Sequence, residues 1–263
     1  MSSTALVLAA HGSRVEPATN LHLSELARRI AARGVCDEAL PAFHHGEPGF
    51  AAVLDRLRAT DVVVVPVMTS EGYFCDVVLP RELRKNHRYA EVAVHQTPPV
   101  GVHPMIGALI RGRIDQLARQ FGIALRDACV AIVGHGTTRH ARSREATVRL
   151  AEQLRAEQEF ADVRFAFLDE DPSIETLVAG IAPRDLLVIP FLISGGPHAN
   201  IDIPTRLGLW PSLDEPPPFV GRIAGRRVIC DRAIGLDPAI ADIIANLALE
   251  SRAVAKVALE PSV

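Results

Sequence analysis

The stretch Leu186–Pro204, LLVIPFLISGGPHANIDIP, decides the fold, because a short apolar run in it leads directly into a glycine turn. A continuous apolar run of this length, closed by Pro190, is typical of a strand that is covered on both faces. Two glycines then precede His198, so this histidine lies just past the carboxyl end of the strand. Ligands bind at that edge of open α/β sheets. The stretch therefore predicts a parallel sheet with His198 at its ligand-binding edge.

A similar stretch, DVVVVPVMTSEGYFCDVVLP, occupies residues 61–80. The two stretches align without a gap when Leu186–Pro204 is extended back to Asp185. They then share four residues, and each pair is 124 positions apart (for example 185 − 61): Asp61 and Asp185, Pro66 and Pro190, Gly72 and Gly196, Pro80 and Pro204. The same offset places His11-Gly12 on His135-Gly136. Two tandem copies of one unit explain this pattern better than a single domain does. One position breaks the symmetry, because the first copy has Phe74 where the second has His198.

Strands and helices alternate in both copies, which indicates parallel β-α-β units. In the first copy the pattern predicts strands at 5–10, 40–43, 61–67 and 90–94, with helices near 23–30, 51–57, 80–85 and 105–120. In the second copy strands are expected at 129–133, 163–168, 186–189 and 226–230, with helices at 145–157, 174–180 and 239–247. Each half is thus expected to be a small, doubly wound, flavodoxin-like α/β sheet.

The repeat sets the expected domain boundaries at 1–124 and 125–263, with a linker near Phe121–Asp127. Pro104 and Pro238 are 134 positions apart (238 − 104), which is ten more than the upstream offset. The second copy therefore carries an insertion, which we place near Trp210–Pro218.

Composition excludes several classes of protein. The chain has 263 residues, 48% of them hydrophobic, which is enough for two ordinary cores, and its formal charge of −3 gives no basic surface for nucleic acid. No apolar run approaches the ~20 residues that span a bilayer, and no signal-peptide pattern is seen, so we expect a cytoplasmic protein without membrane contact. The four cysteines form no C-x-x-C pair, and P-loop, dinucleotide-binding and nucleophile-elbow motifs are absent. We expect neither a nucleotide nor a cysteine metal site.

Polar side chains follow three strands of the second copy, at the point where each strand ends. His135 follows the first strand, Asp169 and Glu170 follow the second, and His198 follows the third. The carboxyl ends of neighbouring parallel strands meet at one edge of a sheet, so we expect these side chains to share a cleft. Two imidazoles and a carboxylate can bind a divalent first-row metal, and they can accept protons near neutral pH.

Each of these residues also has a structural explanation. His135 could cap the following helix, the acidic run at 169–171 could complement a helix dipole, and His198 could be a surface-loop histidine. Their coincidence on one edge favours a functional site.

The first copy has different residues at these positions. It keeps His11, but it has His44-His45 in place of Leu168-Asp169, and Phe74 in place of His198. Either the first half has lost its site or its residues line a shared cleft from the other side.

These motifs resemble those of the class II, ATP-independent tetrapyrrole chelatases, and in particular the sirohydrochlorin cobaltochelatase/ferrochelatase family. The resemblance is carried by His-Gly-Thr at 135–137, Phe-Leu-Asp at 167–169, Val-Ile-Pro-Phe-Leu-Ile at 188–193 with the Gly-Gly-Pro-His and Asp-Ile-Pro that follow, and Ile-Gly-Leu-Asp-Pro at 234–238. It covers almost the whole chain as two tandem units and is strongest over Gly134–Asp202. It implies two chelatase-like halves that face a central cleft.

The resemblance also implies an activity, namely insertion of Co²⁺, or of Fe²⁺ or Ni²⁺, into sirohydrochlorin or a related tetrapyrrole in cobalamin or sirohaem biosynthesis. His135 and His198 match the family's metal-binding and catalytic histidines. Asp169, with Glu170, matches its acidic residue. The macrocycle is expected in the cleft, and the candidates for contacts with its periphery are Arg139, Arg142, Arg144, Arg206 and His11.

In the mechanism we infer, a neutral histidine delivers the metal and accepts pyrrole protons, which a carboxylate passes to solvent. A tandem chain could supply the pairing that a single unit would need from a dimer, so a monomer is expected. Two other classes stay open: a non-catalytic protein that binds a metal or a tetrapyrrole, and a metal-dependent hydrolase that uses the same side chains.

Overall fold

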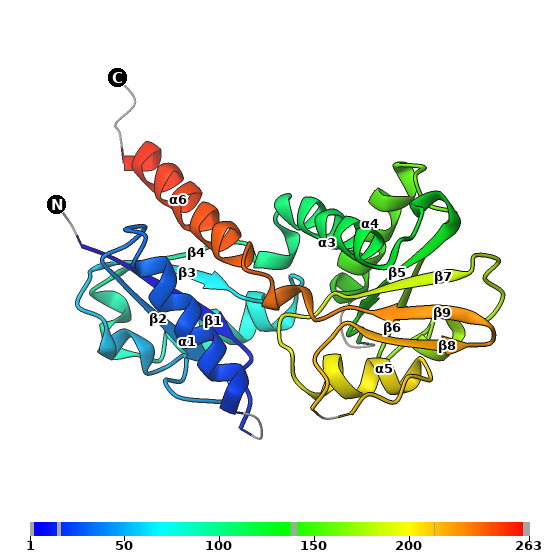
Figure 1. Ribbon diagram of the computed structural model, residues 1–263. Coiled ribbons are helices and arrows are strands. Elements are labelled where there is room, and N and C mark those ends of the chain that lie inside the picture. Colours follow the sequence, from blue (N-terminus) through cyan, green and yellow to red (C-terminus); the bar gives the residue numbers. More distant parts are fainter. Residues whose placement is uncertain (1–2, 15–16, 138–140, 213, 260–263) are drawn as a thin grey trace. The chain divides into compact units, whose positions relative to one another are not determined.

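The structure is a computed structural model that describes residues 3–14, 17–137, 141–212 and 214–259 (Figure 1). The chain forms two compact units, of which unit 1 comprises Met1–His103 and Pro238–Val263, and unit 2 comprises Pro104–Asp237. Each unit is built on one mainly parallel sheet, as the alternation of strands and helices predicts. No helix in the described part of the chain is both long and apolar enough to cross a membrane.

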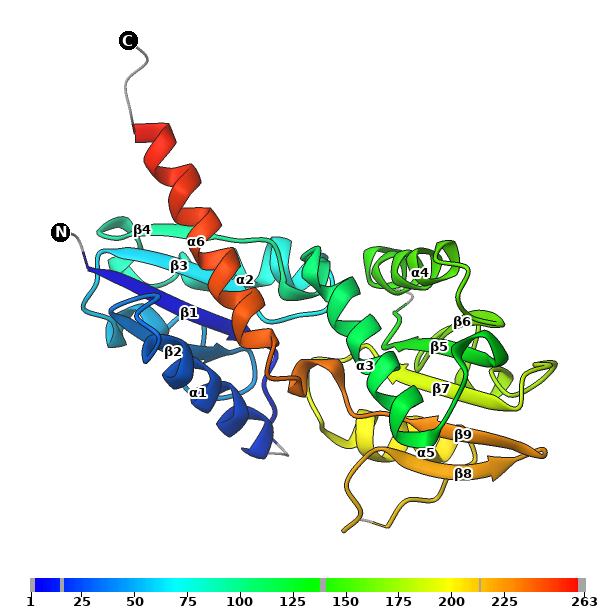
Figure 2. The same ribbon diagram turned by 45° about the horizontal axis from the view of Figure 1, so that its top comes forward.

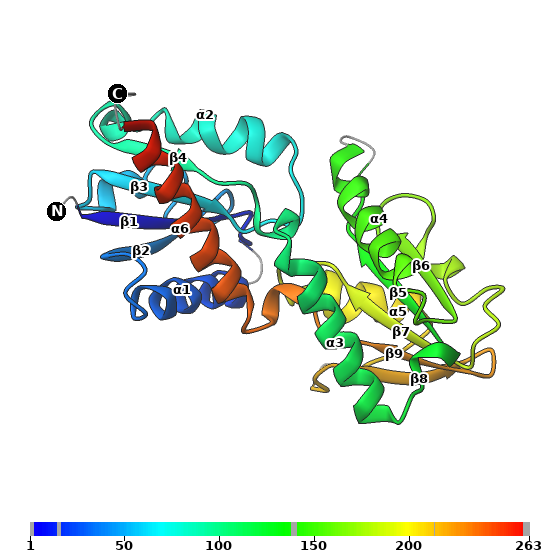
Figure 3. The same ribbon diagram turned by 90° about the horizontal axis from the view of Figure 1, so that it is seen from above.

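The sheet of unit 1 has the strand order β2-β1-β3-β4, and all of its strands are parallel. The strands are β1 (Thr4–Ala10), β2 (Glu38–Phe43), β3 (Asp61–Pro66) and β4 (Ala93–Gln96). The helices α1 (Pro17–Ala31) and α6 (Ile240–Leu259) contact each other and the sheet, and α2 (Leu79–Leu83) adds its leucines to the core on the other face (Figure 3). The central strands β1 and β3 are buried on both faces, which explains their continuous apolar sequences.

The sheet of unit 2 has the strand order β6-β5-β7-β9-β8 (Figure 2). The parallel strands are β5 (Ala128–Gly134), β6 (Asp162–Phe167), β7 (Asp185–Pro190) and β9 (Arg226–Cys230). The helices of this unit are α3 (Met105–Phe121), α4 (Ala141–Ala156) and α5 (Ile203–Arg206). One edge strand, β8 (Phe219–Ile223), is antiparallel to β9 and follows directly on the predicted insertion. The insertion therefore lengthens the sheet by one strand, which the sequence did not predict.

The closing helices of the two repeats are exchanged between the units. The helix α3 ends the first repeat in sequence, yet it packs on β7 and α4 of unit 2. Conversely, α6 ends the second repeat and packs on β3 and α1 of unit 1. The predicted boundaries at 1–124 and 125–263 therefore follow the repeat and not the compact units. An apolar helix face shows that a helix is buried, but it does not show which sheet buries it.

The predicted linker at Phe121–Asp127 is consequently not a boundary between the units. Gly122 ends α3 in the left-handed conformation, with φ of 63°, and a short 3-10 turn at Leu125–Asp127 leads into β5 within unit 2. The chain instead passes between the units after His103 and returns after Asp237.

Several predicted helices are shorter or longer than the apolar pattern indicated. The helices expected at 51–57 and 174–180 are 3-10 turns over Val53–Arg56 and Ile174–Thr176. A further 3-10 turn at His87–Ala90 delays the fourth strand to Ala93. By contrast, α6 continues twelve residues past the predicted end at Leu247, to Leu259 (259 − 247). Periodicity places these segments correctly but does not fix where hydrogen bonding stops.

Gly235 must be a glycine for steric reasons. A Cβ at this position would overlap the backbone of Ile193, and Gly101, the matching residue of unit 1, faces the backbone of Thr69 in the same way. We expect Gly235→Ala to lower the free energy of unfolding of unit 2 by ~1–3 kcal/mol, because backbone cannot yield as a flexible side chain would. Urea denaturation measures this change.

Gly112 provides the matched control in the same unit. It lies inside α3, and a Cβ there would meet nothing within 4 Å. Gly112→Ala is expected to leave stability unchanged or to raise it by up to ~1 kcal/mol, because alanine favours helix. Equal losses in the two variants would contradict the close-approach argument.

Candidate functional site

The candidate site lies at the carboxyl-terminal edge of the sheet of unit 2. His135 directly follows β5, and Gly136 then turns the chain with φ of 70°. A Cβ on Gly136 would lie 2.8 Å from Glu170 Cγ, so this turn requires glycine both for its left-handed backbone and for the approach of Glu170. The turn leaves the His135 side chain 44% exposed.

His198 meets His135 at this edge. It begins the π-helical turn His198–Asp202, which follows β7, and β7 is the direct neighbour of β5. The centroids of the two imidazole rings are 5.1 Å apart, and the ring planes make an angle of 84°. The prediction that neighbouring strand ends bring these histidines together is confirmed.

Asp169 comes to the same place from the end of β6. Its backbone N–H donates to the carbonyl of His135 at 3.0 Å, and its Oδ2 lies 3.4 Å from His135 Nδ1. The same Nδ1 lies 3.0 Å from the carbonyl oxygen of Gly136. A carbonyl only accepts, so Nδ1 carries a proton, and in the neutral ring Nε2 keeps its lone pair. An imidazole in this tautomer can bind a metal or accept a proton through Nε2.

Glu170 lies deeper than Asp169. Its side chain is only 14% exposed, Oε2 is 3.8 Å from an Arg144 guanidinium nitrogen, and Oε1 has no hydrogen-bond partner among the described residues. Arg144 is stacked near the rings of Phe165 and Phe167 and donates to the carbonyl of Asp171. Of the two predicted carboxylates, Asp169 therefore lies beside His135, and Glu170 packs beneath the His135 turn.

The predicted arginines differ in their availability. Arg139 lies outside the described residues, and Arg142 is exposed on α4. Arg206 is already occupied: it donates to both carboxylate oxygens of Glu175, at 2.7 and 3.1 Å, and to the carbonyl of Leu168. Three of the five N–H groups of Arg206 are therefore already engaged within the unit.

The Glu175–Arg206 pair predicts a pH-dependent stability. The hydrogen bonds from Arg206 lower the pKa of Glu175 to about 2. Because this pKa lies below that of an unfolded glutamate, ~4.3, the stabilisation is present above pH ~4.5 and is lost as the pH falls through about 2. Glu175→Gln should cost less than ~1 kcal/mol at pH 7, since both side chains are partly exposed, and a smaller amount at pH 2, where Glu175 is partly protonated. Thermal unfolding at both pH values tests this, and an equal loss at pH 2 would contradict it.

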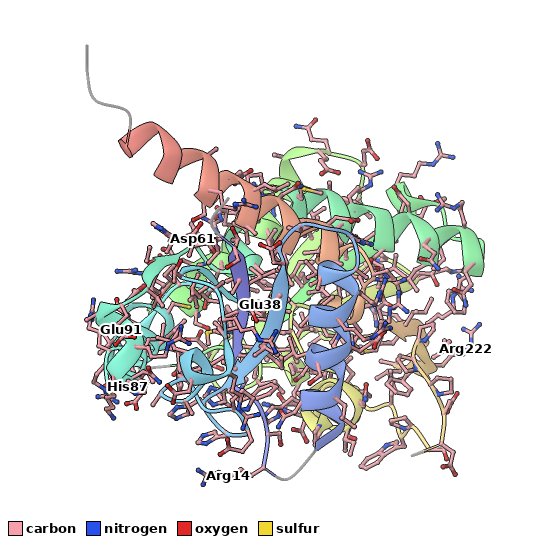
Figure 4. All side chains as sticks on the ribbon, turned by 90° about the vertical axis from the view of Figure 1, so that its left-hand side faces the viewer. Arg14, Glu38, Asp61, His87, Glu91 and Arg222 are labelled. Carbon is pink, nitrogen blue, oxygen red and sulfur yellow. The ribbon has the colours of Figure 1, made fainter. Side chains whose placement is uncertain are left out.

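The matching edge of unit 1 holds a different set of side chains. His11 follows β1, His44 and His45 follow β2, and the ring of Phe74 lies 4.4 Å from that of His11 and 5.0 Å from that of His44. The imidazoles of His44 and His45 are 4.3 Å apart. Burial lowers the pKa of His44, and repulsion by the neighbouring His45 lowers it further. Figure 4 marks the two ends of this sheet, with Asp61 at the start of β3 and Arg14 beyond the end of β1.

One residue of the candidate site was missed by the sequence analysis. Asp202 lies 2.6 Å from His198 through its Oδ2 and the ring Nδ1. The only signal for it is its spacing of four residues from His198, which places both side chains on one helix face. Within the described residues, no group of three or more histidine, cysteine, aspartate or glutamate side chains is arranged to hold a metal ion.

Comparison with known proteins assigns the chain to a class of metal chelatases. A family model described as CbiX matches residues 5–117 and again residues 129–251. The chain therefore belongs to the CbiX family and consists of two tandem copies of its unit.

Named relatives agree with this assignment. The chain is 31% identical over 271 residues to the "Probable sirohydrochlorin cobaltochelatase" of Halobacterium salinarum, covering 95% of this chain and 92% of that protein. Its fold matches SirB from Bacillus subtilis, solved with Fe³⁺, with a TM-score of 0.77 at 19% identity over 97% of this chain and 98% of that one. It also matches a multi-domain Deinococcus radiodurans protein with structural similarity to chelatases, with a TM-score of 0.72 and 25% identity. That match covers 96% of this chain and 56% of the larger one.

Proposed function

We propose that this chain inserts a divalent metal, Co²⁺ in the first place and Fe²⁺ or Ni²⁺ as alternatives, into sirohydrochlorin or a related tetrapyrrole without consuming a nucleotide. The observation that carries the proposal is the pair of exposed imidazoles, His135 and His198, 5.1 Å apart beside the Asp169 carboxylate. The substrate is suggested by the cobaltochelatase name of the Halobacterium relative, which matches nearly the whole chain. Cobalamin or sirohaem biosynthesis would use the product.

The reaction exchanges charge without any redox step. A tetrapyrrole that takes up M²⁺ releases two N–H protons, so the overall charge of the macrocycle is unchanged. The protein must therefore supply ligands that bind the ion weakly enough to release it, and bases that remove two protons. Neutral imidazoles do both, and they bind most divalent first-row ions.

The residues of the unit 2 edge can be given roles on this basis. His135 and His198 hold the incoming metal and accept the pyrrole protons. Asp169, 3.4 Å from His135 Nδ1, carries protons on to solvent, and the more buried Glu170 supports this transfer. The side chain of Ile201, which is 42% exposed in the same turn as His198, offers an apolar contact for the macrocycle.

The periphery of such a macrocycle carries carboxylates, which arginines bind well. Arg139 and Arg142 remain candidates for these contacts, together with Arg144 and His11. Arg206 is a further candidate, and Glu175 accepts hydrogen bonds from its guanidinium.

The proposal is tested by an anaerobic insertion assay without nucleotide. Purified protein is mixed with sirohydrochlorin and Co²⁺, Fe²⁺ or Ni²⁺ in separate reactions, and the visible spectrum is followed against a reaction without protein. We expect faster formation of the metal complex with protein, and fastest with Co²⁺. No acceleration with any of the three ions would contradict the proposal. In a separate assay without a tetrapyrrole, chelator-sensitive hydrolysis of an ester by the protein would also contradict it.

A further inference from the structure

The carboxylate of Asp202 is hydrogen-bonded to the ring of His198. The Oδ2 of Asp202 lies 2.6 Å from His198 Nδ1, which is shorter than the His135–Asp169 distance of 3.4 Å and the Arg144–Glu170 distance of 3.8 Å at the same edge. An ionised carboxylate has no hydrogen to donate, so Nδ1 of His198 must carry the proton of this hydrogen bond. In the neutral ring, the other nitrogen, Nε2, then keeps the lone pair that a metal ion or a pyrrole proton needs.

The geometry of the turn makes this contact possible. His198 and Asp202 are the first and last residues of the π-helical turn, four positions apart, and therefore lie on the same face. Single π-helical turns are rare and are found frequently at functional sites.

The side chain of Asp202 does not cap the helix that follows it. Asp202 is the N-cap residue of the four-residue helix α5, but within the part of the chain that the structure describes the Asp202 side chain makes no capping hydrogen bond. The nearest cation in sequence, Arg206, forms its hydrogen bonds with Glu175 and the Leu168 carbonyl. Among the described residues, the hydrogen-bond partner of the Asp202 carboxylate is His198. Hydrogen bonding to Glu175 raises the pKa of Arg206, and the charge of Asp202 adds to this larger effect.

The repeat supplies an internal comparison. Unit 1 has a π-helical turn at the same place, Phe74–Val78, whose first and last residues match His198 and Asp202 at the offset of 124 (198 − 74 and 202 − 78). Both members of the pair are apolar there, and Val78 is 3% exposed. The turn therefore forms without an acidic residue at its last position. The aspartate is present in the unit that has the histidine and absent from the unit that lacks it.

We propose that Asp202 is a positioning residue for His198. It fixes the rotation of the ring and its Nδ1–H tautomer, so that Nε2 is always the nitrogen presented for metal transfer. Carboxylates that accept a hydrogen bond from a metal-binding histidine act in this way, and their loss costs ~10–100-fold in metal affinity or activity. The effect on turnover rests on the proposed function, whereas the effect on the ring does not.

Nitrogen NMR of histidine-labelled protein tests the ring directly. In metal-free protein kept in alkaline buffer, the His198 resonances, assigned by their loss in His198→Ala, should show the Nδ1–H tautomer. Asp202→Ala should shift the ring towards the Nε2–H tautomer, which is the commoner form of a free imidazole. Asp202→Asn keeps an acceptor oxygen and should retain the wild-type tautomer in part. Asp214→Ala, in the exposed insertion, is the matched control and should change nothing.

Binding and kinetics complete the test. Titration of the metal-free protein with Co²⁺ should give a Kd ~10–100-fold higher in Asp202→Ala than in wild type, with Asp202→Asn between them. In the insertion assay, the KM for Co²⁺ should rise while the KM for the tetrapyrrole stays constant. Far-UV circular dichroism should match wild type, because a valine is tolerated in the equivalent turn of unit 1.

Two failures are distinguishable. If the tautomer of His198 and the Kd for Co²⁺ are the same in Asp202→Ala and wild type, the positioning role is wrong whatever the activity. If wild type inserts no metal but Asp202→Ala still changes the tautomer and weakens Co²⁺ binding, the positioning role stands and the proposed function is wrong.

Discussion

His198→Ala should lower kcat/KM for metal insertion by ~10²–10⁴-fold, which is the range for loss of a positioned proton acceptor. The variant removes one of the two imidazoles at the unit 2 edge, so the ion loses a ligand and a pyrrole proton loses its base. His135→Ala should have an effect of similar size. The double variant should lose little more than either single one, because residues that act as a unit are not additive. Initial rates in the anaerobic insertion assay measure these losses.

His87→Ala is the matched control for these variants. His87 belongs to unit 1, and its side chain is 78% exposed beside Asp55 (Figure 4). Its removal should leave the rate within about twofold of wild type. Wild-type rates in His135→Ala and His198→Ala, with all proteins equally folded by circular dichroism, would remove the basis for placing the chemistry at this edge.

A chain that ends at Asp237 should fail to fold unit 1. It lacks α6, whose side chains Ile240, Ile243, Ile244 and Leu247 are at most 4% exposed. Burial of each such side chain contributes ~1.5–3 kcal/mol. Their combined loss is comparable to the whole stability of a typical domain, ~5–15 kcal/mol. The ion pair of Arg33 with Asp242 would be lost as well, at little further cost because both side chains are exposed.

Two fragments of the chain test whether the compact unit includes the exchanged helix or follows the sequence repeat. Residues 104–237 include α3 and form unit 2, so this fragment should unfold cooperatively in urea. Residues 125–263 follow the sequence repeat but lack α3, which leaves the face of β7 uncovered, and this fragment should lack a cooperative transition. Equal cooperativity of the two fragments would contradict the exchange of α3 and α6.

The architecture could be predicted from the sequence because two independent patterns agree, namely the apolar runs of the strands and the repeat of the whole unit. The valine and isoleucine runs at 62–65 and 186–189 have the continuous apolar character of buried parallel strands, and the fixed offset of 124 shows that they are equivalent. Strand ends that meet at one edge then place His135, Asp169 and His198 together, and the structure confirms that juxtaposition.

What could not be predicted depends on choices that local sequence leaves open. The apolar face of α3 or α6 predicts that the helix is buried, but it does not specify which sheet the helix covers. The strand β8 alternates buried and exposed residues over only five positions, Phe219–Ile223, within an insertion that has no counterpart in the first repeat. Arg206 was expected to face a substrate, whereas the structure pairs it with Glu175, thirty-one positions away. Long-range pairing of this kind leaves no periodic signal.

The amount of product formed per mole of protein tests the central claim most directly. Wild-type protein is given a large excess of sirohydrochlorin and Co²⁺, without nucleotide and under anaerobic conditions, and the cobalt complex is quantified from its spectrum after the uncatalysed reaction is subtracted. The account predicts many equivalents of product per chain, and a rate that falls in His198→Ala. Product formation that stops at one equivalent would identify a binding protein and would contradict the account.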